Sequence, residues 1–312
     1  MALENINWYP GHMKKTRELI TENLKLVDMV IEVVDARIPV SSRNPIIDEL
    51  VQNKPRIILL NKSDLADGNE NKAWTENLKK SARENNAEGI VNVMRVDSLH
   101  GTGIKELLSA LTDYQNRINE NRERKKTLRL MIVGVPNVGK SSFINRLTGR
   151  KATQTGDRPG VTKGKQWLTM TNGMQLLDTP GILWPKFEDQ NVGLALAYCG
   201  SIKDEILDTD SLALSLIGRL MAEYPKELKE RYKIDELPDE ALEGMELIAK
   251  KRGFILGGGR IDYERCARTV LDEFRSGKIG RITLEKVDAS TDNNSKGKDS
   301  SDCDDNNLEE EK

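Results

Sequence analysis

The sequence predicts an α/β fold, a mainly parallel β-sheet flanked by helices, followed by a small all-helical domain. Up to about residue 187, short apolar runs alternate with stretches of helical spacing, which is typical of βαβ units and a parallel sheet. From about residue 188 the strand pattern disappears and only helical spacing remains. We therefore expect one domain over residues 1–187, a helical domain over 188–287 and a polar tail over 288–312.

The elements predicted for the first domain follow a regular order. Leu19, Ile20, Leu24 and Val27 share one helical face and indicate a helix over residues 14–27. The segment 119–127, NENRERKKT, is a charged connector. Strands are predicted over 29–35, 56–60, 90–96, 128–134, 166–170 and 174–178, and helices over 70–85, over 104–118 and from the glycine-rich loop through Leu147.

Four segments of helical spacing make up the predicted second domain. Several begin after an aspartate, which can cap a helix N-terminus, and several end at a glycine. They cover residues 191–200, 210–224, 239–253 and 262–279.

The composition favours a soluble protein of the cytoplasm. The chain of 312 residues is 37% hydrophobic and 31% charged, and it contains no run of eighteen apolar residues that could span a membrane. Its N-terminal stretch lacks the apolar segment of a signal peptide. Cys199, Cys266 and Cys303 lie far apart without a CxxC pair, so we expect neither a disulfide framework nor a zinc site.

The near-neutral net charge of the chain is the sum of an acidic C-terminal segment and a mildly basic remainder. Residues 288–312 hold nine acidic and three basic residues, a net charge of −6, and almost no apolar residue. Since the whole chain carries −2, the remaining residues carry +4. We expect a disordered tail, either a solvating segment or a partner-binding one, on a mildly basic folded body.

A phosphate-binding loop is predicted at residues 134–141, GVPNVGKS, between a strand and a helix. Its glycines let backbone N–H groups surround phosphate oxygens, while Lys140 supplies a cation and Ser141 offers a hydroxyl to Mg²⁺. A chance strand–turn–helix is the alternative, against which the flanking elements argue. The predicted nucleotide contacts are Asn137, Val138, Gly139, Lys140, Ser141 and Ser142.

A second phosphate-side motif, DTPG at residues 178–181, directly follows an apolar strand. Asp178 would hold Mg²⁺ through water, and the Gly181 N–H would contact the γ-phosphate. Between the two motifs, Thr162 is the candidate that closes on Mg²⁺ and the γ-phosphate, with Thr155 as second choice. The alternative for Thr162 is an ordinary turn threonine.

The motif NKSD at residues 61–64 predicts recognition of guanine. The Asp64 carboxylate can accept hydrogen bonds from N1–H and N2–H₂ of guanine, a pair of donors that adenine lacks. Asn61 would brace the base and its loop, and the stem of Lys62 would lie along the base plane. Residues 96–104, VDSLHGTGI, resemble the loop whose backbone N–H groups contact the guanine carbonyl. The residues assigned to it are Asp97, Ser98 and Leu99.

The order of these motifs along the chain predicts a circularly permuted P-loop GTPase domain. The base-reading motif precedes the phosphate loop, whereas it normally follows it. Such a permutation is reasonable because the ends of a domain usually lie close together at its surface. The connector at 119–127 would join the former last helix to the former first strand, and the switch region would run directly into the helical domain.

Together these motifs resemble the ribosome biogenesis GTPase A family, the YlqF type of circularly permuted GTPases. The resemblance covers about residues 1–285 and includes NWYPGHM, DAR.P, NKSD, GVPNVGKS, PGVT and DTPG. It implies a GTPase that binds GTP or GDP with Mg²⁺ and carries a helical domain likened to RNA-binding ANTAR modules. It also implies action late in assembly of the large ribosomal subunit, with the subunit precursor and its rRNA as partners and a monomer away from the ribosome.

Hydrolysis requires a group that orients the attacking water, for which Ras-like enzymes use a glutamine just after DxxG. Here Ile182, Leu183 and Trp184 follow, and none has a side chain that can do this. The resemblance implies His12, in a segment that the ribosome would order, and packing or helix capping is the alternative. His100, in the base loop, is expected to be a bystander.

The resemblance also implies a potassium ion. In related GTPases an asparagine at the position of Asn137 helps to coordinate K⁺, which adds positive charge beside the β- and γ-phosphates. An ordinary turn asparagine is the alternative. We expect slow intrinsic hydrolysis that the partner accelerates.

Basic residues gather late in the helical domain, where nine of them stand against five acidic ones between Glu246 and Arg281. Such a surface can neutralise phosphates without reading sequence, although solvated helix faces would give the same count. The resemblance favours rRNA, and Lys14, Lys15 and Arg17 would extend the contact. The nine are Lys250, Lys251, Arg252, Arg260, Arg265, Arg268, Arg275, Lys278 and Arg281.

Two other functions are open from the sequence. One is a GTPase with a different RNA target, although the chain lacks the CxxC or Cys-rich terminus of a second catalytic centre. The other is a GTP-gated RNA-binding scaffold with negligible hydrolysis, which the hydrophobic Ile182 favours.

Overall fold

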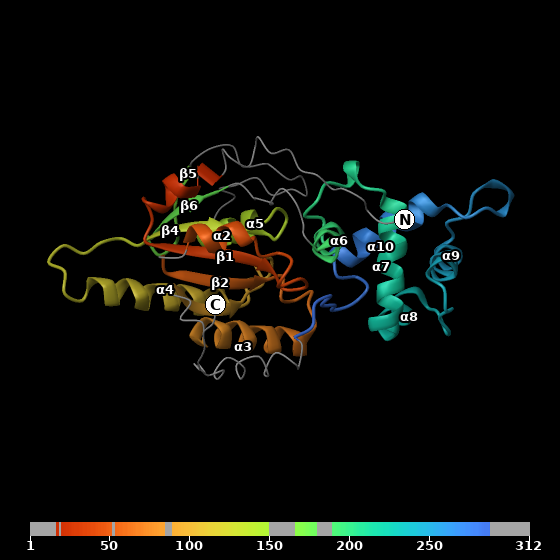
Figure 1. The fold of residues 1–312 in the computed structure, drawn as a ribbon, viewed down its shortest axis with the longest axis horizontal. Coiled ribbons are helices and arrows are strands. Elements are labelled where there is room, and N and C mark those ends of the chain that lie inside the picture. Colours follow the sequence, from red (N-terminus) through yellow and green to blue (C-terminus); the bar gives the residue numbers. More distant parts are fainter. Residues whose placement is uncertain are drawn as a thin grey trace, which may run out of the picture.

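The computed structural model describes residues 17–18, 20–51, 54–84, 89–149, 166–179 and 189–287. A six-stranded sheet with its helices forms one part, and a group of helices forms a second part beside it (Figure 1). The first part contains β1 (Met29–Asp35), α2 (Pro45–Val51), β2 (Arg56–Asn61), α3 (Gly68–Glu84), β3 (Ile90–Arg95), α4 (Ile104–Asn119), β4 (Arg129–Val133), α5 (Lys140–Thr148), β5 (Gln166–Thr169) and β6 (Gln175–Asp178). The second contains α6 (Gln190–Tyr198), η1 (Asp204–Ile206), α7 (Thr209–Glu223), α8 (Pro225–Tyr232), α9 (Ala241–Arg252), η2 (Gly257–Gly259) and α10 (Tyr263–Arg275).

The sheet has the strand order β3-β2-β1-β4-β6-β5, and all its pairs are parallel except β5 with β6. The chain therefore runs outward from β1 through β2 to β3, and α4 then carries it back to start β4 on the other side of β1. In open α/β sheets, ligands bind at the carboxyl ends of the strands where the order reverses. Here that place lies beyond the ends of β1 and β4.

The two faces of the sheet follow from the alternation of side chains along each strand. Ile31 of β1 and Ile132 of β4 belong to the core on the face that also contains Leu107 of α4 and Phe143 of α5. Their neighbours Val30 and Met131 belong to a second core, with Ile47 of α2 and the helical residues 20–24. A third core joins α3 to the ends of β1 and β2. The sheet is thus covered on both sides.

The second part shares a continuous core with the first. Leu196 of α6, Leu216 of α7 and Val270 of α10 belong to the same buried cluster as Val135 and Val138 of the predicted phosphate loop. Aspartates begin three of these helices, because Asp189, Asp208 and Asp262 each accept a hydrogen bond from the first turn that follows. The helical part is therefore packed directly against the loop side of the sheet.

After α10 the chain returns to the first part. We call residues 277–287 the return segment. The Ile282 N–H donates to the Leu65 carbonyl oxygen at 2.9 Å, and the Leu284 N–H donates to the Arg37 carbonyl oxygen at 2.8 Å. The return segment is thereby bonded to the residues that follow β1 and β2.

The predicted strands and helices in the described residues are found with small shifts in their bounds. Helices α2 and α8 were not predicted, since each begins at a proline that reads as a break but also suits the first turn of a helix. The helical part also contains one antiparallel bridge, between Ile255 and Ile261. Residues 180–188, where the two predicted domains meet, lie outside the described residues, as does the tail, so the domain limits stay predictions.

Within the part of the chain that the structure describes, no helix is long and apolar enough to cross a membrane. Cys199 and Cys266 are buried free thiols, and burial raises the pKa of each to about 12.

Candidate nucleotide-binding site

The predicted phosphate loop connects β4 to α5 in a conformation that requires glycine. Gly134 and Gly139 have φ values of 151° and 93°. A Cβ atom on Gly134 would lie 2.4 Å from the Val33 carbonyl oxygen, and one on Gly139 would lie 2.4 Å from Nδ2 of Asn61. Neither approach is possible for a larger residue. The loop is therefore pressed against the ends of β1 and β2.

Lys140, the first residue of α5, has a buried ammonium group that points back into the loop. It donates to the carbonyl oxygens of Gly134 at 3.0 Å and Val135 at 2.7 Å. Burial lowers the pKa of Lys140 to about 8; Asp178 opposes this effect and Lys62 adds to it. A desolvated cation at a helix N-terminus, surrounded by a glycine loop, fits an anionic ligand such as a phosphate chain.

Two of the predicted magnesium residues lie close to Lys140 in sequence or in space: Ser141 follows it in α5, and the charge of Asp178 acts on its ammonium group. Ser141 lies in the first turn of α5, and Asp178, the last residue of β6, is 2% exposed. Thr179 donates through its hydroxyl to the Ile132 carbonyl oxygen, which fixes the end of β6 beside β4. A hydroxyl and a carboxylate are oxygen ligands of the kind that Mg²⁺ takes, so these residues fit the ion.

Asn61, at the end of β2, joins the base-reading motif to the phosphate loop. Its Nδ2 donates to the Val138 carbonyl oxygen at 2.7 Å. Its Oδ1 accepts from the backbone N–H of Ser98 at 3.1 Å and from the Ser98 hydroxyl at 2.7 Å. Three predicted segments that are distant in sequence therefore meet at one buried amide.

The next residues of the motif surround the same place. Lys62 has a φ of 56°, and its Nζ donates to the Asn137 carbonyl oxygen at 2.6 Å and lies 3.0 Å from Oδ2 of Asp35. Asp64 keeps 30% of its side chain exposed at the edge of this arrangement. The carboxylate of Asp64 is therefore accessible to a guanine base. It follows Lys62, whose ammonium group bonds to the phosphate loop.

The base loop is shaped by Asp97. Its Oδ1 accepts from the N–H groups of Leu99 at 2.8 Å and His100 at 2.9 Å, and its Oδ2 lies 2.6 Å from Nδ1 of His100. Leu99 itself is 69% exposed. His100 was expected to be a bystander, but it contacts Asp97 and lies 3.9 Å from Oδ2 of Asp64. Asp97 therefore holds the base loop in shape, and its contact with the nucleotide stays a prediction.

Arg146 of α5 is a site residue that the sequence did not reveal. Its Nε donates to the Ser98 carbonyl oxygen at 3.2 Å, and its guanidinium also donates to the Leu99 carbonyl oxygen. The helix that starts at the phosphate loop is thus bonded to the base loop. No local pattern predicts this role for Arg146, because its partners Ser98 and Leu99 lie 48 and 47 residues away in sequence.

Asn137 connects the phosphate loop to the helical part. Its φ is 58°, and its Nδ2 donates to the Gly200 carbonyl oxygen at 2.6 Å. The neighbouring Pro136 carbonyl oxygen accepts from the Ser201 hydroxyl at 2.8 Å. The amide nitrogen of Asn137 thus bonds within the protein, and its role toward K⁺ stays a prediction.

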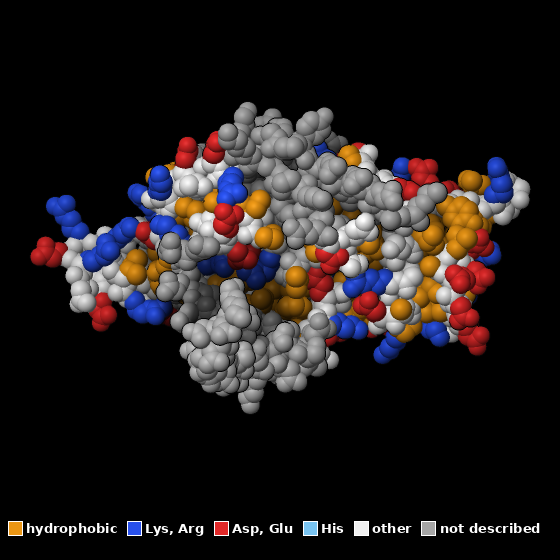
Figure 2. All heavy atoms as spheres, in the orientation of Figure 1, with side chains coloured by type: hydrophobic (Ala, Val, Ile, Leu, Met, Phe, Trp, Pro, Cys, Tyr) orange, Lys and Arg blue, Asp and Glu red, His pale blue; other side chains and the backbone are white. Residues whose placement is uncertain are grey.

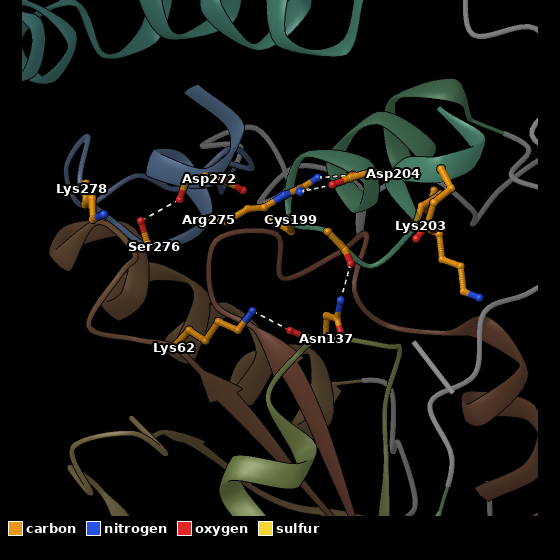
Figure 3. Close-up of a pocket in the computed structure, with 12 residues that line it drawn as sticks. Lys62, Asn137, Cys199, Lys203, Asp204, Asp272, Arg275, Ser276 and Lys278 are labelled. Carbon is orange, nitrogen blue, oxygen red and sulfur yellow. Dashed lines mark hydrogen bonds and ion pairs between the residues drawn. The ribbon is translucent and has the colours of Figure 1, made fainter. Parts of the chain in front are cut away.

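A cavity of about 880 Å³ opens beside this contact, between the loop side of the sheet and the helices. Figure 3 shows Lys62 and Asn137 on one wall and the segments around Cys199 and Arg275 on the other. The wall formed by the helical part is rich in charged side chains and the opposite wall adds the cation of Lys62, which suits a polar ligand.

Several predicted site residues cannot be placed in this way. His12, Thr155, Thr162, Gly181 and the run 182–184 lie outside the described residues. The roles assigned to them therefore stay predictions.

The predicted basic surface of the helical part is smaller than the count suggested. Arg275 donates to the carbonyl oxygens of Ala197 and Tyr198 and pairs with Asp204. Two others also bond within the protein: Arg252 to Glu273, and Arg281 to the carbonyl oxygens of Ser63 and Ala66. Figure 2 shows Lys and Arg interspersed with Asp and Glu on the visible side of these helices. The remaining cations are Lys250, Lys251, Arg260, Arg265, Arg268 and Lys278, all of them exposed.

Comparison with known proteins agrees with this geometry. A family model described as "50S ribosome-binding GTPase" matches residues 129–240, and one described as "Elongation factor Tu GTP binding domain" matches residues 5–117. The two matches divide the chain at the connector between α4 and β4. This is the division expected when a GTPase domain is circularly permuted.

Relatives match over most of the chain. Ribosome biogenesis GTPase A of Priestia megaterium is 46% identical over 285 residues, which cover 90% of this chain and 96% of that protein. Mitochondrial ribosome-associated GTPase 1 of Ictalurus punctatus is 35% identical over 301 residues, covering 89% and 92%. The crystal structure of GNP-bound YlqF from T. maritima is 30% identical, covers 87% of this chain and 98% of its own, and has a TM-score of 0.61.

The relatives thus support the same assignment as the structure. That assignment rests on the phosphate loop, the guanine-reading motif and the permuted order of the strands. The protein is a GTP hydrolase that binds guanine nucleotides. The chain belongs to the ribosome biogenesis GTPase A family, the YlqF type of circularly permuted P-loop GTPases.

Proposed function

We propose that this GTPase acts late in the assembly of the large (50S) ribosomal subunit. It binds the precursor particle and its rRNA with GTP and leaves on hydrolysis, as a monomer of the cytoplasm when it is off the ribosome. The observation that supports this most is the match over 90% of the chain to proteins named ribosome biogenesis GTPase A.

Nucleotide binding follows from the geometry of the loop. The backbone N–H groups of residues 137–142 surround the phosphates at the N-terminus of α5, and Lys140 exchanges its carbonyl partners for phosphate oxygens. Asp64 accepts both donors of the guanine edge, while Asn61 holds the base loop and the phosphate loop at a fixed separation. Asp64 thereby selects the guanine base, and the charge of Lys140 holds the phosphates.

Magnesium would be held by Ser141 and Asp178 together with Thr162, where it would neutralise charge on the β- and γ-phosphates. The buried Lys140 would contact the outer phosphates, and the Gly181 N–H is proposed to contact the γ-phosphate. Asn137 is proposed as a ligand of K⁺ on the same side. His12 is proposed as the group that orients the attacking water, with a rate that rises when the ribosomal particle orders its segment.

Nucleotide state can be passed to the helical part through short contacts. The phosphate loop bonds to the turn after α6 through Asn137 and Pro136. A rearrangement of the phosphate loop on hydrolysis changes how the helical part packs against that loop. Packed interfaces of this kind shift between discrete arrangements. Release from the particle would follow from this change.

The exposed cations of α9, α10 and the segments that follow η2 and α10 are the proposed rRNA contact. Lys251, Arg260 and Lys278 have no ion-pair partner among the described residues, while Lys250 and Arg268 pair only with acidic residues of their own helices. Contacts of this kind neutralise phosphates and weaken as salt is raised. We expect binding with little sequence preference and a strong dependence on ionic strength.

The first experiment is GTP turnover in K⁺ buffer, alone and with purified 30S, 50S and 70S particles. His12→Ala is measured alongside, with Lys25→Ala as the control, a change at an exposed residue in the turn before β1. Stimulation by 50S that is lost in His12→Ala but kept in Lys25→Ala supports both the assembly role and His12. Stimulation that survives His12→Ala keeps the particle and discards His12. No stimulation by any particle rejects the ribosomal proposal in favour of another RNA target or a scaffold with negligible hydrolysis.

A further inference from the structure

The residues Asp35-Ala36-Arg37 follow the central strand β1 and are not part of the nucleotide contacts described above. Asp35 and Arg37 are nevertheless almost completely buried, with 1% exposure each. A buried ion pair contributes little net stability compared with apolar packing, because both charges lose their hydration. Its position between two functional regions therefore calls for an explanation beyond stability.

On one side, Asp35 holds the base-reading lysine. Oδ2 of Asp35 lies 3.0 Å from Nζ of Lys62, and the same Nζ donates to the Asn137 carbonyl oxygen. The ammonium of Lys62 is thus fixed between β1 and the phosphate loop. This fixes the direction of the Lys62 stem, the part of the side chain that would lie along a guanine ring.

On the other side, Asp35 holds Arg37 in a bidentate pair. Nε of Arg37 donates to Oδ1 at 3.0 Å and Nη2 donates to Oδ2 at 2.8 Å, while the backbone N–H of Arg37 donates to Oδ1 at 3.1 Å. Burial raises the pKa of Asp35, but Arg37 and Lys62 outweigh it and leave that pKa well below its usual range. The carboxylate stays charged and shares its two oxygens between two cations.

Arg37 in turn holds the end of the last helix. Its Nη1 donates to the carbonyl oxygens of Phe274 and Arg275, each at 3.3 Å, and its guanidinium lies 5.2 Å from the centre of the Phe274 ring. These carbonyls are in the last turn of α10, where a cation also favours the helix dipole. The Arg37 carbonyl oxygen accepts from Leu284 of the return segment.

The return segment adds a second connection between the same two regions. Arg281 donates to the carbonyl oxygens of Ser63 at 3.1 Å and Ala66 at 3.0 Å, on either side of Asp64. A Cβ on Gly277 would lie 2.6 Å from Cδ2 of Leu65. The base-reading motif and the end of α10 are therefore in direct contact, and Asp35 and Arg37 are the buried part of that contact.

We propose that Asp35 and Arg37 are positioning residues for guanine recognition, which hold Lys62 in its base-reading direction and join this motif to the end of α10. The helical part then influences guanine affinity, and a bound guanine stabilises the end of α10 and the return segment by the same amount. This inference rests on the proposed guanine recognition by residues 61–64.

The first test separates base binding from phosphate binding. Asp35→Asn keeps the shape of the side chain and removes the charge that Lys62 and Arg37 share. We expect affinity for GDP to fall about tenfold, because a charge-assisted contact of Lys62 is lost, while affinity for inorganic pyrophosphate stays within about twofold. Equal losses for both ligands, or no loss for GDP, would overturn the positioning role.

Glu32→Gln is the matched control for that test. Glu32 lies on the same strand, is as buried as Asp35 and pairs with Arg43 and Arg56, away from the nucleotide site. A change that merely loosens β1 would affect both variants alike. We expect Glu32→Gln to leave GDP and pyrophosphate affinity unchanged within about twofold.

The second test measures the connection to α10. In the wild type we expect GDP to slow backbone amide exchange both at residues 61–66 and at residues 276–285. Arg37→Lys keeps the charge but lacks the planar fork that reaches Asp35 and the two carbonyls. In this variant GDP should still protect residues 61–66 and protect 276–285 clearly less than in the wild type. Some protection of 276–285 should stay, since Arg281 and Ile282 keep their contacts with residues 63–66. Protection of residues 276–285 in Arg37→Lys equal to that in the wild type would disprove the role of Arg37 in the connection.

The outcome for the wild type separates this inference from the proposed function. Wild-type protein that binds ADP as tightly as GDP would refute guanine recognition by residues 61–64. Wild-type protein that prefers GDP, with Asp35→Asn unchanged, would refute only the positioning role. If Arg37→Lys fails to fold, as judged by its circular dichroism, Asp35→Asn still decides the inference.

Discussion

The side-chain amide of Asn61 donates a hydrogen bond to the carbonyl oxygen of Val138 across 77 residues of sequence. The contact joins the end of β2 to the phosphate loop, and the other end of the amide holds Ser98 of the base loop. Base recognition and phosphate recognition therefore share one buried side chain. An asparagine suits this position because its amide carries a donor and an acceptor on separate atoms, one for each loop.

Asn61→Ala should weaken both the fold and nucleotide binding. It leaves the Val138 carbonyl and the Ser98 N–H buried without partners, which costs about 2 kcal/mol of unfolding free energy, measured by urea denaturation. Affinity for GDP should fall by roughly a hundredfold, because base loop and phosphate loop lose their fixed separation. Asn44→Ala, a buried asparagine that accepts from Ile46 at the start of α2, should lower stability alone. Equal loss of GDP affinity in Asn44→Ala would argue against a specific role for Asn61.

Asp64→Asn should change base preference rather than abolish binding. Xanthine has a carbonyl oxygen where guanine has its amino group, so an amide that both donates and accepts complements xanthine. We expect GDP affinity to drop by roughly 10²- to 10³-fold and xanthosine diphosphate to become the better ligand. Direct titration with both nucleotides tests this. Asp67→Asn, three residues later at the start of α3, should keep guanine preference.

Gly139→Ala should prevent the phosphate loop from closing on Asn61. The new Cβ would meet Nδ2 of Asn61 at 2.4 Å, at a backbone φ of 93° that alanine rarely adopts. We expect a loss of about 1–3 kcal/mol of stability and no measurable GDP binding by calorimetry. Gly173→Ala, at a positive φ with open space around it, is the control for backbone strain alone. Loss of GDP binding in both variants would assign the effect to strain and not to the contact.

The affinity for GDP should decrease as pH rises above 8. In the free protein, burial lowers the pKa of Lys140 to about 8, and bound phosphates would raise it, so binding takes up a proton above that pH. Affinity should fall about tenfold between pH 7 and pH 9. Calorimetry in two buffers of different ionisation enthalpy measures the proton uptake. Lys140→Met should show none, and uptake that persists there would assign it to another group.

The same shift affects the stability of the free protein with the opposite sign. Between about 8 and the ordinary lysine value of 10.5, the unfolded chain holds more protons than the folded one. The contribution of Lys140 to stability therefore rises with pH through this window. Thermal unfolding of the nucleotide-free protein at pH 7 to 10, compared with Lys140→Met, isolates that contribution.

Most of the fold of the first part could be read from local pattern. β1 and β2 were predicted within one residue of their bounds, because buried strands between turns have a clear apolar run. GVPNVGKS and NKSD were found because their chemistry depends on residues that are adjacent in sequence. The helices α2 and α8 were not predicted because each begins at a proline and, at seven and eight residues, is too short to show a clear helical periodicity.

The sequence was sufficient for those features because strand alternation, glycine turns and contiguous motifs depend on neighbours a few residues apart. It could not reveal that Asn61 bonds to Val138, that Arg146 holds the base loop, or that Arg37 reaches Phe274 across 237 residues. Nor could a count of cations show that Arg275 and Arg281 bond within the protein. These contacts join residues that are far apart in sequence. The order of strands in the sheet and the return of the chain after α10 bring the partners together, so the packing of the whole chain determines them.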